Sequence, residues 1–152
     1  MTIEPVYFAN AQLALSAVIT VKHQFKALHR WAECPYEEQA FLRNWHRHVF
    51  HVTLSVAVGH NDRDFEFFRV QGALADLCSE EWEQRQVEMS CEMFAVAIIK
   101  TFIEEGFPVH RCTVSEDGEN EAQVVVRNLH LPAQSVLCSV PTRLAALLGG
   151  GT

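Results

Sequence analysis

The strongest fold signal in this chain is the stretch of residues 46–58, HRHVFHVTLSVAV, in which alternate side chains differ in character. Successive residues of a β-strand point to opposite faces of its sheet, so this pattern predicts one long, half-buried strand. The first face carries His46, His48, Phe50, Val52, Leu54, Val56 and Val58. The second face carries Arg47, Val49, His51, Thr53, Ser55 and Ala57. Two histidines therefore begin the strand on its more apolar face.

A second alternating stretch precedes it and predicts a neighbouring strand over residues 20–28. One face of this strand carries Val21, His23, Phe25 and Ala27, and the other carries Lys22, Gln24 and Lys26. If the strand continues for one or two residues, His29 joins the face of Phe25 and Ala27. Residues 30–45 contain Pro35 and lack the alternation, so we expect a loop with one helical turn there.

The remainder of the chain predicts a turn, two helices and two more strands. Residues 59–62 (GHND) indicate a turn, and residues 64–68 a strand end that leads into the first helix. Helices are expected over residues 71–84 and 90–105, with Ser90 as the N-cap of the second and Gly106 and Pro108 as its stop. Strands are expected over residues 109–114 and 122–127.

This order, β-β-α-α-β-β, predicts an α+β protein with an antiparallel sheet and both helices packed on one face. The length of 152 residues suggests a single domain, residues 1–152, with its core over about residues 20–130. Residues 1–18 are ambiguous between an N-terminal strand and an arm. Residues 131–152 are expected to form a C-terminal tail.

Composition and charge limit the classes of function. The net charge of −7 argues against a nucleic-acid partner, although a local cluster of Arg and His can still attract an anionic substrate. The five cysteines are odd in number and form no C-x-x-C pair, so reduced thiols in the cytoplasm fit better than a disulfide framework. The sequence has no signal-peptide pattern and no long apolar segment, so we expect no membrane association.

Three histidines form a candidate metal site. His46 and His48 lie two residues apart on one strand face, roughly 6.6 Å apart along the chain, so both rings can turn toward one ion. His29, at the end of the neighbouring strand on the matching face, supplies a third imidazole. Three histidines leave one position open for water or substrate, which is the pattern of a catalytic zinc site. The alternative is that they are polar strand-end or satisfied core residues, although Trp and Arg side chains cluster nearby.

Four short segments, in order, resemble the 6-pyruvoyltetrahydropterin synthase / 6-carboxytetrahydropterin synthase family. They are residues 25–30 (FKALHR), 46–48 (HRH), 90–95 (SCEMFA) and 114–116 (VSE). The corresponding family patterns are F-x-A-x-H-R, H-G-H, T-S-E-x-x-A and V-x-E-T. The resemblance covers about residues 20–127 and implies the tunnelling fold, a four-stranded antiparallel sheet with two helices. It also implies a homo-oligomeric ring, often a hexamer formed as a dimer of trimers.

The resemblance further implies roles for individual residues. His29, His46 and His48 would bind Zn²⁺, and Glu116 would anchor the guanidine-like edge of a pterin ring, with Ser90 and Glu92 nearby. The implied activity is that of a carbon–oxygen lyase, which releases triphosphate from 7,8-dihydroneopterin triphosphate or a related pterin or purine-like small molecule. The implied pathway is pterin or queuosine-type biosynthesis. Judged from the residues alone, Glu116 fits a solvated turn acid and Ser90 a plain N-cap.

The sequence departs from the family at its catalytic positions. The usual Cys, four residues before the first His of H-G-H, is Leu42, and the family's Asp-His pair has no counterpart in residues 79–89. Cys34, Glu37 and Glu38 are candidate replacement bases, unless they are an ordinary loop thiol and a solvated acidic face. Two alternatives therefore stay open: a diverged family member that runs other chemistry, and a non-catalytic pterin or purine binder.

Overall fold

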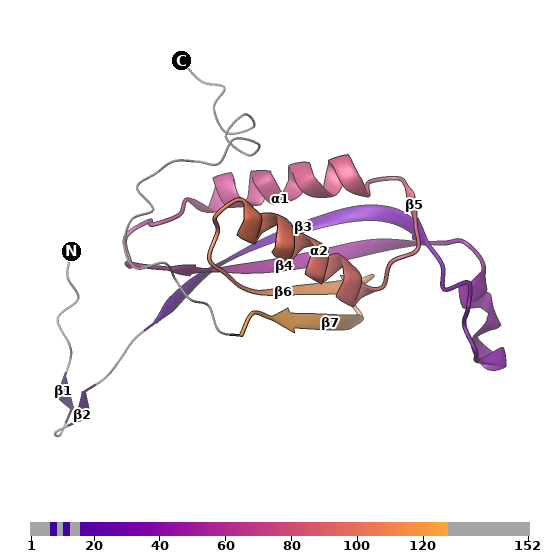
Figure 1. The fold of residues 1–152 in the computed structure, drawn as a ribbon, viewed down its shortest axis with the longest axis horizontal. Helices are drawn as coiled ribbons and strands as arrows, with labels where there is room; N and C mark the ends of the chain where they lie inside the picture. The colour runs from indigo at the N-terminus through magenta and orange to yellow at the C-terminus, as the bar shows by residue number, and fades with distance from the viewer. Residues whose placement is uncertain (1–6, 9–10, 13–15, 128–152) are drawn as a thin grey trace, which may run out of the picture.

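The chain is represented by a computed structural model, which describes residues 7–8, 11–12 and 16–127 (Figure 1). A short ladder joins β1 (Tyr7–Phe8) to β2 (Ala11–Gln12). The main strands are β3 (Ala17–His29), β4 (His46–Val58), β5 (Gln86–Val87), β6 (Val109–Glu116) and β7 (Asn120–Val125). The helices are η1 (Glu37–Arg43), a 3₁₀-helix, α1 (Phe67–Glu81) and α2 (Cys91–Glu104).

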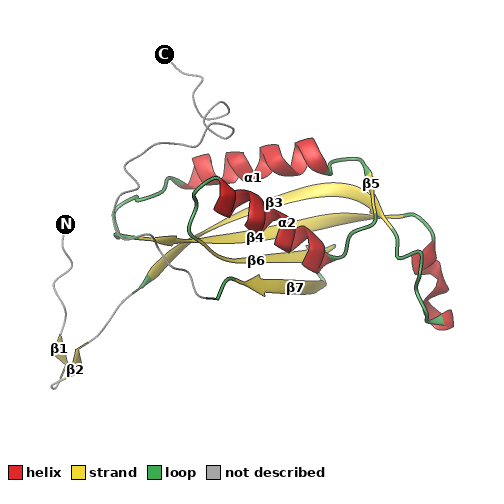
Figure 2. Cartoon of the chain, in the orientation of Figure 1, coloured by secondary structure: helices red, strands yellow, loops and turns green. Residues whose placement is uncertain are grey.

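The larger sheet has the strand order β5-β3-β4-β6-β7 (Figure 2). β3 and β4 pair antiparallel from Ala17↔Val58 to His29↔His46, and β6 and β7 continue the antiparallel pattern. The expected count of four strands is corrected to five, because β5 pairs parallel with the end of β3. Two residues make this extra ladder where the connection between the helices passes β3, and two residues are too few to show an alternating pattern.

Both helices pack on one face of this sheet, as predicted (Figure 1). The buried residues of α1 are Val70, Ala73, Leu74 and Cys78, and those of α2 are Phe94, Ala95, Ile98, Ile99 and Phe102. They form one core with the inward face of the strands, where Phe25 and Phe50 stack with ring centroids 5.2 Å apart. The same strand faces carry the three histidines, so the candidate site lies where this apolar core ends.

The two helix boundaries differ in how well the sequence predicted them. α2 begins after Ser90, whose hydroxyl accepts a hydrogen bond from the Met93 N–H at 3.3 Å, as expected for an N-cap. α1 begins at Phe67, earlier than the predicted residue 71, because the Glu66 side chain accepts from the Arg69 N–H and caps the helix there. The strand end expected over residues 64–68 is therefore wrong, since Phe67 and Phe68 already form the first helical turn.

The loop between β3 and β4 contains the expected helical turn, η1, which extends beyond the end of the sheet (Figure 2). The four cysteines in the described part of the chain are free thiols. No helix among the described residues is long and apolar enough to cross a membrane. The predicted C-terminal tail, residues 131–152, lies outside the described residues.

Candidate metal centre

Three histidine rings meet where β3 ends and β4 begins. His29 and His46 are directly paired in the ladder, and His48 lies two residues further along the same face of β4. The ring centroids are 4.4 Å apart for His29–His46, 5.0 Å for His29–His48 and 5.1 Å for His46–His48. One nitrogen from each ring lies within 4.8 Å of the other two, close enough for all three to hold one metal ion. The fold therefore brings the predicted trio together.

Backbone carbonyl groups orient two of these rings. His46 Nδ1 lies 2.7 Å from the carbonyl oxygen of Asn44, and His29 Nδ1 lies 3.4 Å from that of Met89. A carbonyl oxygen only accepts, so each Nδ1 carries the proton and each Nε2 keeps its lone pair. Both Nε2 atoms are buried and have no hydrogen-bond partner among the described residues. A cation that faces these two lone pairs would remove the cost of burying them unsatisfied.

A carboxylate orients the third ring. Asp117 accepts a hydrogen bond from His48 Nδ1 at 2.5 Å through one oxygen and from the Val49 N–H at 2.9 Å through the other. These hydrogen bonds lower the pKa of Asp117, so its carboxylate stays charged. The backbone of Asp117 is left-handed, with φ of 52°, a conformation that Asp tolerates better than most residues. The three Nε2 atoms of the trio are thus all presented as acceptors.

Electrostatics keep His29 in the form that binds metals. The residue is only 8% exposed, and burial lowers the pKa of its imidazole. The negative charge of Glu116 raises that pKa, whereas the neighbouring rings of His46 and His48 lower it again. The net direction is downward, which favours the neutral imidazole that a metal ion requires.

Glu116 reaches the same point from β6. It pairs with Phe50 in the ladder and therefore faces the inward side of the sheet. Its Oε1 lies 3.4 Å from His29 Nε2, and its Oε2 lies 3.9 Å from His48 Nε2. The side chain is 32% exposed. Glu116 is therefore part of the histidine cluster and differs from the solvated turn acid that its neighbours in the sequence suggested.

The start of α2 borders Glu116. Burial, followed by the negative charge of Glu116, raises the pKa of the Cys91 thiol to about 12. Ser90 and Glu92 flank Cys91 in the chain, and both are exposed. The Ser90 hydroxyl caps α2, and a hydrogen bond with Ser90 lowers the pKa of Glu92. A role for Ser90 and Glu92 toward a substrate stays a prediction.

The three candidate bases lie in the loop that contains η1. Cys34 is buried, only 2% exposed, and its Sγ lies 3.9 Å from each of two backbone carbonyl oxygens of its own loop. Glu37 pairs with Arg43 at 2.7 Å, and Glu38 is exposed. Their role as bases stays a prediction, and for Cys34 and Glu37 it requires these contacts to be given up.

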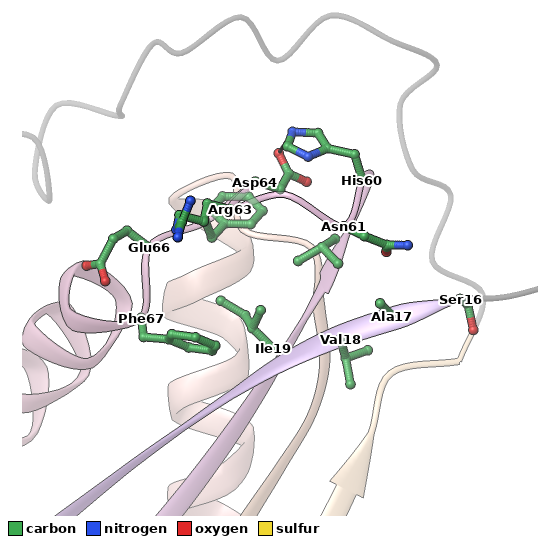
Figure 3. A pocket seen from close by; sticks show the side chains of 12 residues that line it. Ser16, Ala17, Val18, Ile19, His60, Asn61, Arg63, Asp64, Glu66 and Phe67 are labelled. Atoms are coloured by element: carbon green, nitrogen blue, oxygen red, sulfur yellow. Dashed lines mark ion pairs between the residues drawn. The ribbon is translucent and has the colours of Figure 1, made fainter. Parts of the chain in front are cut away.

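A separate hollow of about 530 Å³ lies at the opposite end of the sheet, beside the start of β3 and the end of β4 (Figure 3). Its lining includes Val18, Ile19 and Phe67 together with the polar turn that follows β4. Asp64 in this turn already accepts from the Gly59 N–H at 2.6 Å and lies 3.4 Å from His60 Nε2. No group of three metal-ligating side chains was found there among the described residues, so the candidate chemistry stays with the histidine trio.

Fold and site together define a class: an α+β protein with a three-histidine group, able to hold a metal ion, at the end of an antiparallel sheet. The structure is similar to 6-pyruvoyl tetrahydropterin synthase of Caenorhabditis elegans, with 12% identity, a TM-score of 0.58, and coverage of 74% of this chain and 97% of that one. It is also similar to an uncharacterized protein of Wolinella succinogenes, with 13% identity, a TM-score of 0.63, and coverage of 75% and 100%. No protein-family model and no curated protein sequence matches. The fold is therefore of the 6-pyruvoyl tetrahydropterin synthase type.

Sequence reasoning missed several residues that complete the site. Neither Asp117 nor Cys91 was singled out from the sequence, although Cys91 lies within the matched segment of residues 90–95. The contact of Asp117 with His48 depends on a left-handed turn, for which an Asp-Gly pair at residues 117–118 is the available signal. The carbonyl of Met89 has no side-chain signal at all, because only the path of the chain after β5 places it beside His29.

Proposed function

We propose that this chain is a zinc-dependent carbon–oxygen lyase of the 6-pyruvoyl/6-carboxytetrahydropterin synthase type. Its substrate would be 7,8-dihydroneopterin triphosphate or a related pterin or purine nucleotide. The observation that carries this proposal is the convergence of three imidazole nitrogens at one point. The likeness of the fold to 6-pyruvoyl tetrahydropterin synthase supports the substrate class.

The ligand set favours zinc among the divalent metals. Zinc binds imidazole readily, and three histidines with one remaining position match its catalytic sites. When bound, zinc would make a coordinated substrate hydroxyl or water more acidic. Asn44, Met89 and Asp117 hold the three rings through their Nδ1 atoms, so the chain itself fixes where the ion would sit.

Glu116 is the residue we assign to recognition of the ring. A carboxylate that accepts two N–H groups suits the guanidine-like edge of a pterin, as it suits an Arg side chain. Ser90 and Glu92 would border the ring from the start of α2. Two thiols are candidates for proton transfer: Cys34 in the loop, and Cys91, which lies against Glu116. The raised pKa of Cys91 makes it a proton donor rather than a base at neutral pH.

The sheet edges support a homo-oligomer. β7 lies at one edge, and at the other edge the ladder between β5 and β3 involves only Leu28 and His29. β3 and β7 run antiparallel to one another across the sheet, so β7 of one copy can continue onto β3 of the next. Repeating that contact would give a ring if the rotation closes, and the hexamer that the family resemblance implies would need a second contact between two such rings.

The decisive experiment combines metal content with turnover of 7,8-dihydroneopterin triphosphate, for the parent protein and for His48→Ala. About one zinc per chain, lost in the variant together with triphosphate release, would support the lyase. Zinc without turnover would favour the second candidate, a diverged enzyme or a non-catalytic pterin binder. The sequence observation behind this candidate is that Leu42 replaces the family's Cys. Absence of metal from the parent, even after zinc is added, would refute the proposal.

A Cys34→Ala and Cys91→Ala pair then separates the two thiols. If Cys34 is the base, its variant loses turnover and Cys91→Ala keeps zinc and most activity. If Cys91 serves in proton transfer, the pattern reverses. Glu33→Ala is the matched control for the loop, because Glu33 is exposed, lies beside Cys34 in the chain and is not one of the candidate bases.

A further inference from the structure

The position of Glu116 beside the trio indicates a second role for this residue, in addition to anchoring the ring. Its two carboxylate oxygens lie 3.4 Å from His29 Nε2 and 3.9 Å from His48 Nε2. In the neutral form of each ring, both nitrogens are lone-pair acceptors, because Met89 and Asp117 hold the proton on Nδ1. A carboxylate oxygen is an acceptor as well. In that form the acceptors of the two rings face the acceptors of Glu116, and the Cys91 thiol is the donor that the described residues place against this carboxylate.

Such an arrangement is repulsive unless a positive charge, either a proton or a metal ion, lies between the acceptors. His29 Nε2 is buried and, within the described residues, has no hydrogen-bond partner despite the nearby carboxylate. Glu116 supplies the negative charge that a site of three neutral histidines lacks. A divalent ion would satisfy the lone pairs and the carboxylate together, so the cluster as a whole is complementary to a cation.

The spacing also matches metal coordination. With metal–ligand bonds of about 2.0–2.1 Å, neighbouring ligand atoms of a tetrahedral zinc site lie about 3.4 Å apart. The Glu116 Oε1 to His29 Nε2 distance is 3.4 Å. We infer that Glu116 is a fourth protein ligand of the metal in the substrate-free protein, and that it closes the position which three histidines leave open.

This inference rests on the proposed metal centre and adds a step to it. The proposed substrate needs an open position on the metal and a carboxylate for the edge of its ring. Its binding would therefore have to draw Glu116 away from the ion. Glu116 would then serve the metal before binding and the ring after it. The free protein would thus hold its metal more tightly than three histidines alone allow.

The test uses Co²⁺ as a spectroscopic probe and Zn²⁺ in competition, both without substrate. Parent protein, Glu116→Gln and the control Glu119→Gln are compared. Glu116→Gln keeps the shape of the side chain, and Glu119 is an exposed acid of the following turn. We expect Glu116→Gln to weaken zinc binding by more than the about 10–100-fold typical of an outer partner, and to change the visible Co²⁺ spectrum. Glu119→Gln should match the parent in both.

The outcomes separate this inference from the proposed function. If Glu116→Gln binds both metals with parental affinity and an unchanged spectrum, Glu116 is not a ligand, although the trio still is. A loss confined to about 10–100-fold with an unchanged Co²⁺ spectrum also overturns it, because Glu116 then acts from outside the coordination sphere. If the parent binds neither metal, the metal centre itself fails. Circular dichroism of each variant confirms that the comparison is made between folded proteins.

Discussion

His48 and His51 lie three residues apart on β4, yet the two faces of the strand give them opposite environments. His48 points inward, and its Nδ1 donates to Asp117, so its Nε2 is an acceptor beside two other rings. His51 points outward, and its Nδ1 lies 3.0 Å from the amide nitrogen of Gln24. That nitrogen only donates, so His51 carries its proton on Nε2. The difference teaches that an oxygen acceptor at Nδ1, together with convergent neighbours, makes a histidine a candidate ligand.

The largest expected effect tests this contrast between the faces. Zinc at about 100 times its Kd should stabilise the parent by about 2.7 kcal/mol, visible as a rise in Tm. His46→Ala should lose that response, because it removes one of the three inward nitrogens. His51→Ala should keep it. Equal zinc responses in the two variants, measured by thermal unfolding, would mean that the inward trio is not the binding site.

The next effect concerns the carboxylate that orients His48. Asp117→Asn keeps a residue that tolerates the left-handed turn but removes the charged acceptor from His48 Nδ1. We expect a loss of zinc affinity of about 10–100-fold, or about 1.4–2.8 kcal/mol. Competition with a chelating dye measures it. A parental affinity would show that the backbone alone orients the ring.

A smaller effect tests whether Ser90 contributes to the metal site or only to the stability of α2. Ser90→Ala removes the N-cap of α2 and should lower the free energy of unfolding by about 1 kcal/mol. Zinc affinity should stay parental, because the described contacts of the Ser90 side chain are with the Met93 N–H and with Glu92, and neither residue belongs to the trio. Urea unfolding and zinc competition on the same samples give both numbers. A drop in zinc affinity would extend the site to the start of α2.

The smallest effect concerns His23, which faces inward on β3 and, within the described part of the chain, is not paired with a second ring. Burial lowers its pKa from the ordinary 6.5, and Glu83 partly offsets this. The unfolded chain therefore takes up the proton first, so His23 reduces stability as pH falls below 6.5. His23→Gln should make the metal-free protein less sensitive to acid between about pH 7.5 and 5. Urea unfolding at both pH values checks this, and an unchanged or steeper loss contradicts it.

The sequence predicted the parts of the fold that repeat over many residues. All of β4 and most of β3 were predictable, because the alternation over residues 46–58 and 20–28 leaves little choice of register, whereas the start of β3 at Ala17 was not predicted. The histidine trio followed, since one shared face and one shared end place His29 opposite His46. The cap at Ser90 was predictable because a local hydrogen bond needs no tertiary context.

The features of the fold and site that the sequence did not predict depend on contacts between segments far apart in the chain. The two-residue strand β5 has no periodic signal, and it forms because the connection between α1 and α2 passes β3. The proximity of Asp117 to His48 requires the turn after β6 to fold back on β4. The place of Cys34 inside its own loop likewise depends on packing, and no spacing rule indicates whether a loop thiol points inward.

The meeting of two strand ends, that of β3 and that of β4, at the histidine trio also has a consequence for the lifetime of the protein. An ion held by His29, His46 and His48 would act as a removable cross-link at the base of the loop of residues 30–45. Without it, the ladder at that end should open more often, and amides there should exchange faster with deuterated solvent. A protease should then cut the loop sooner in chelator than in zinc. Metal supply would in that way set how long each chain survives in the cell.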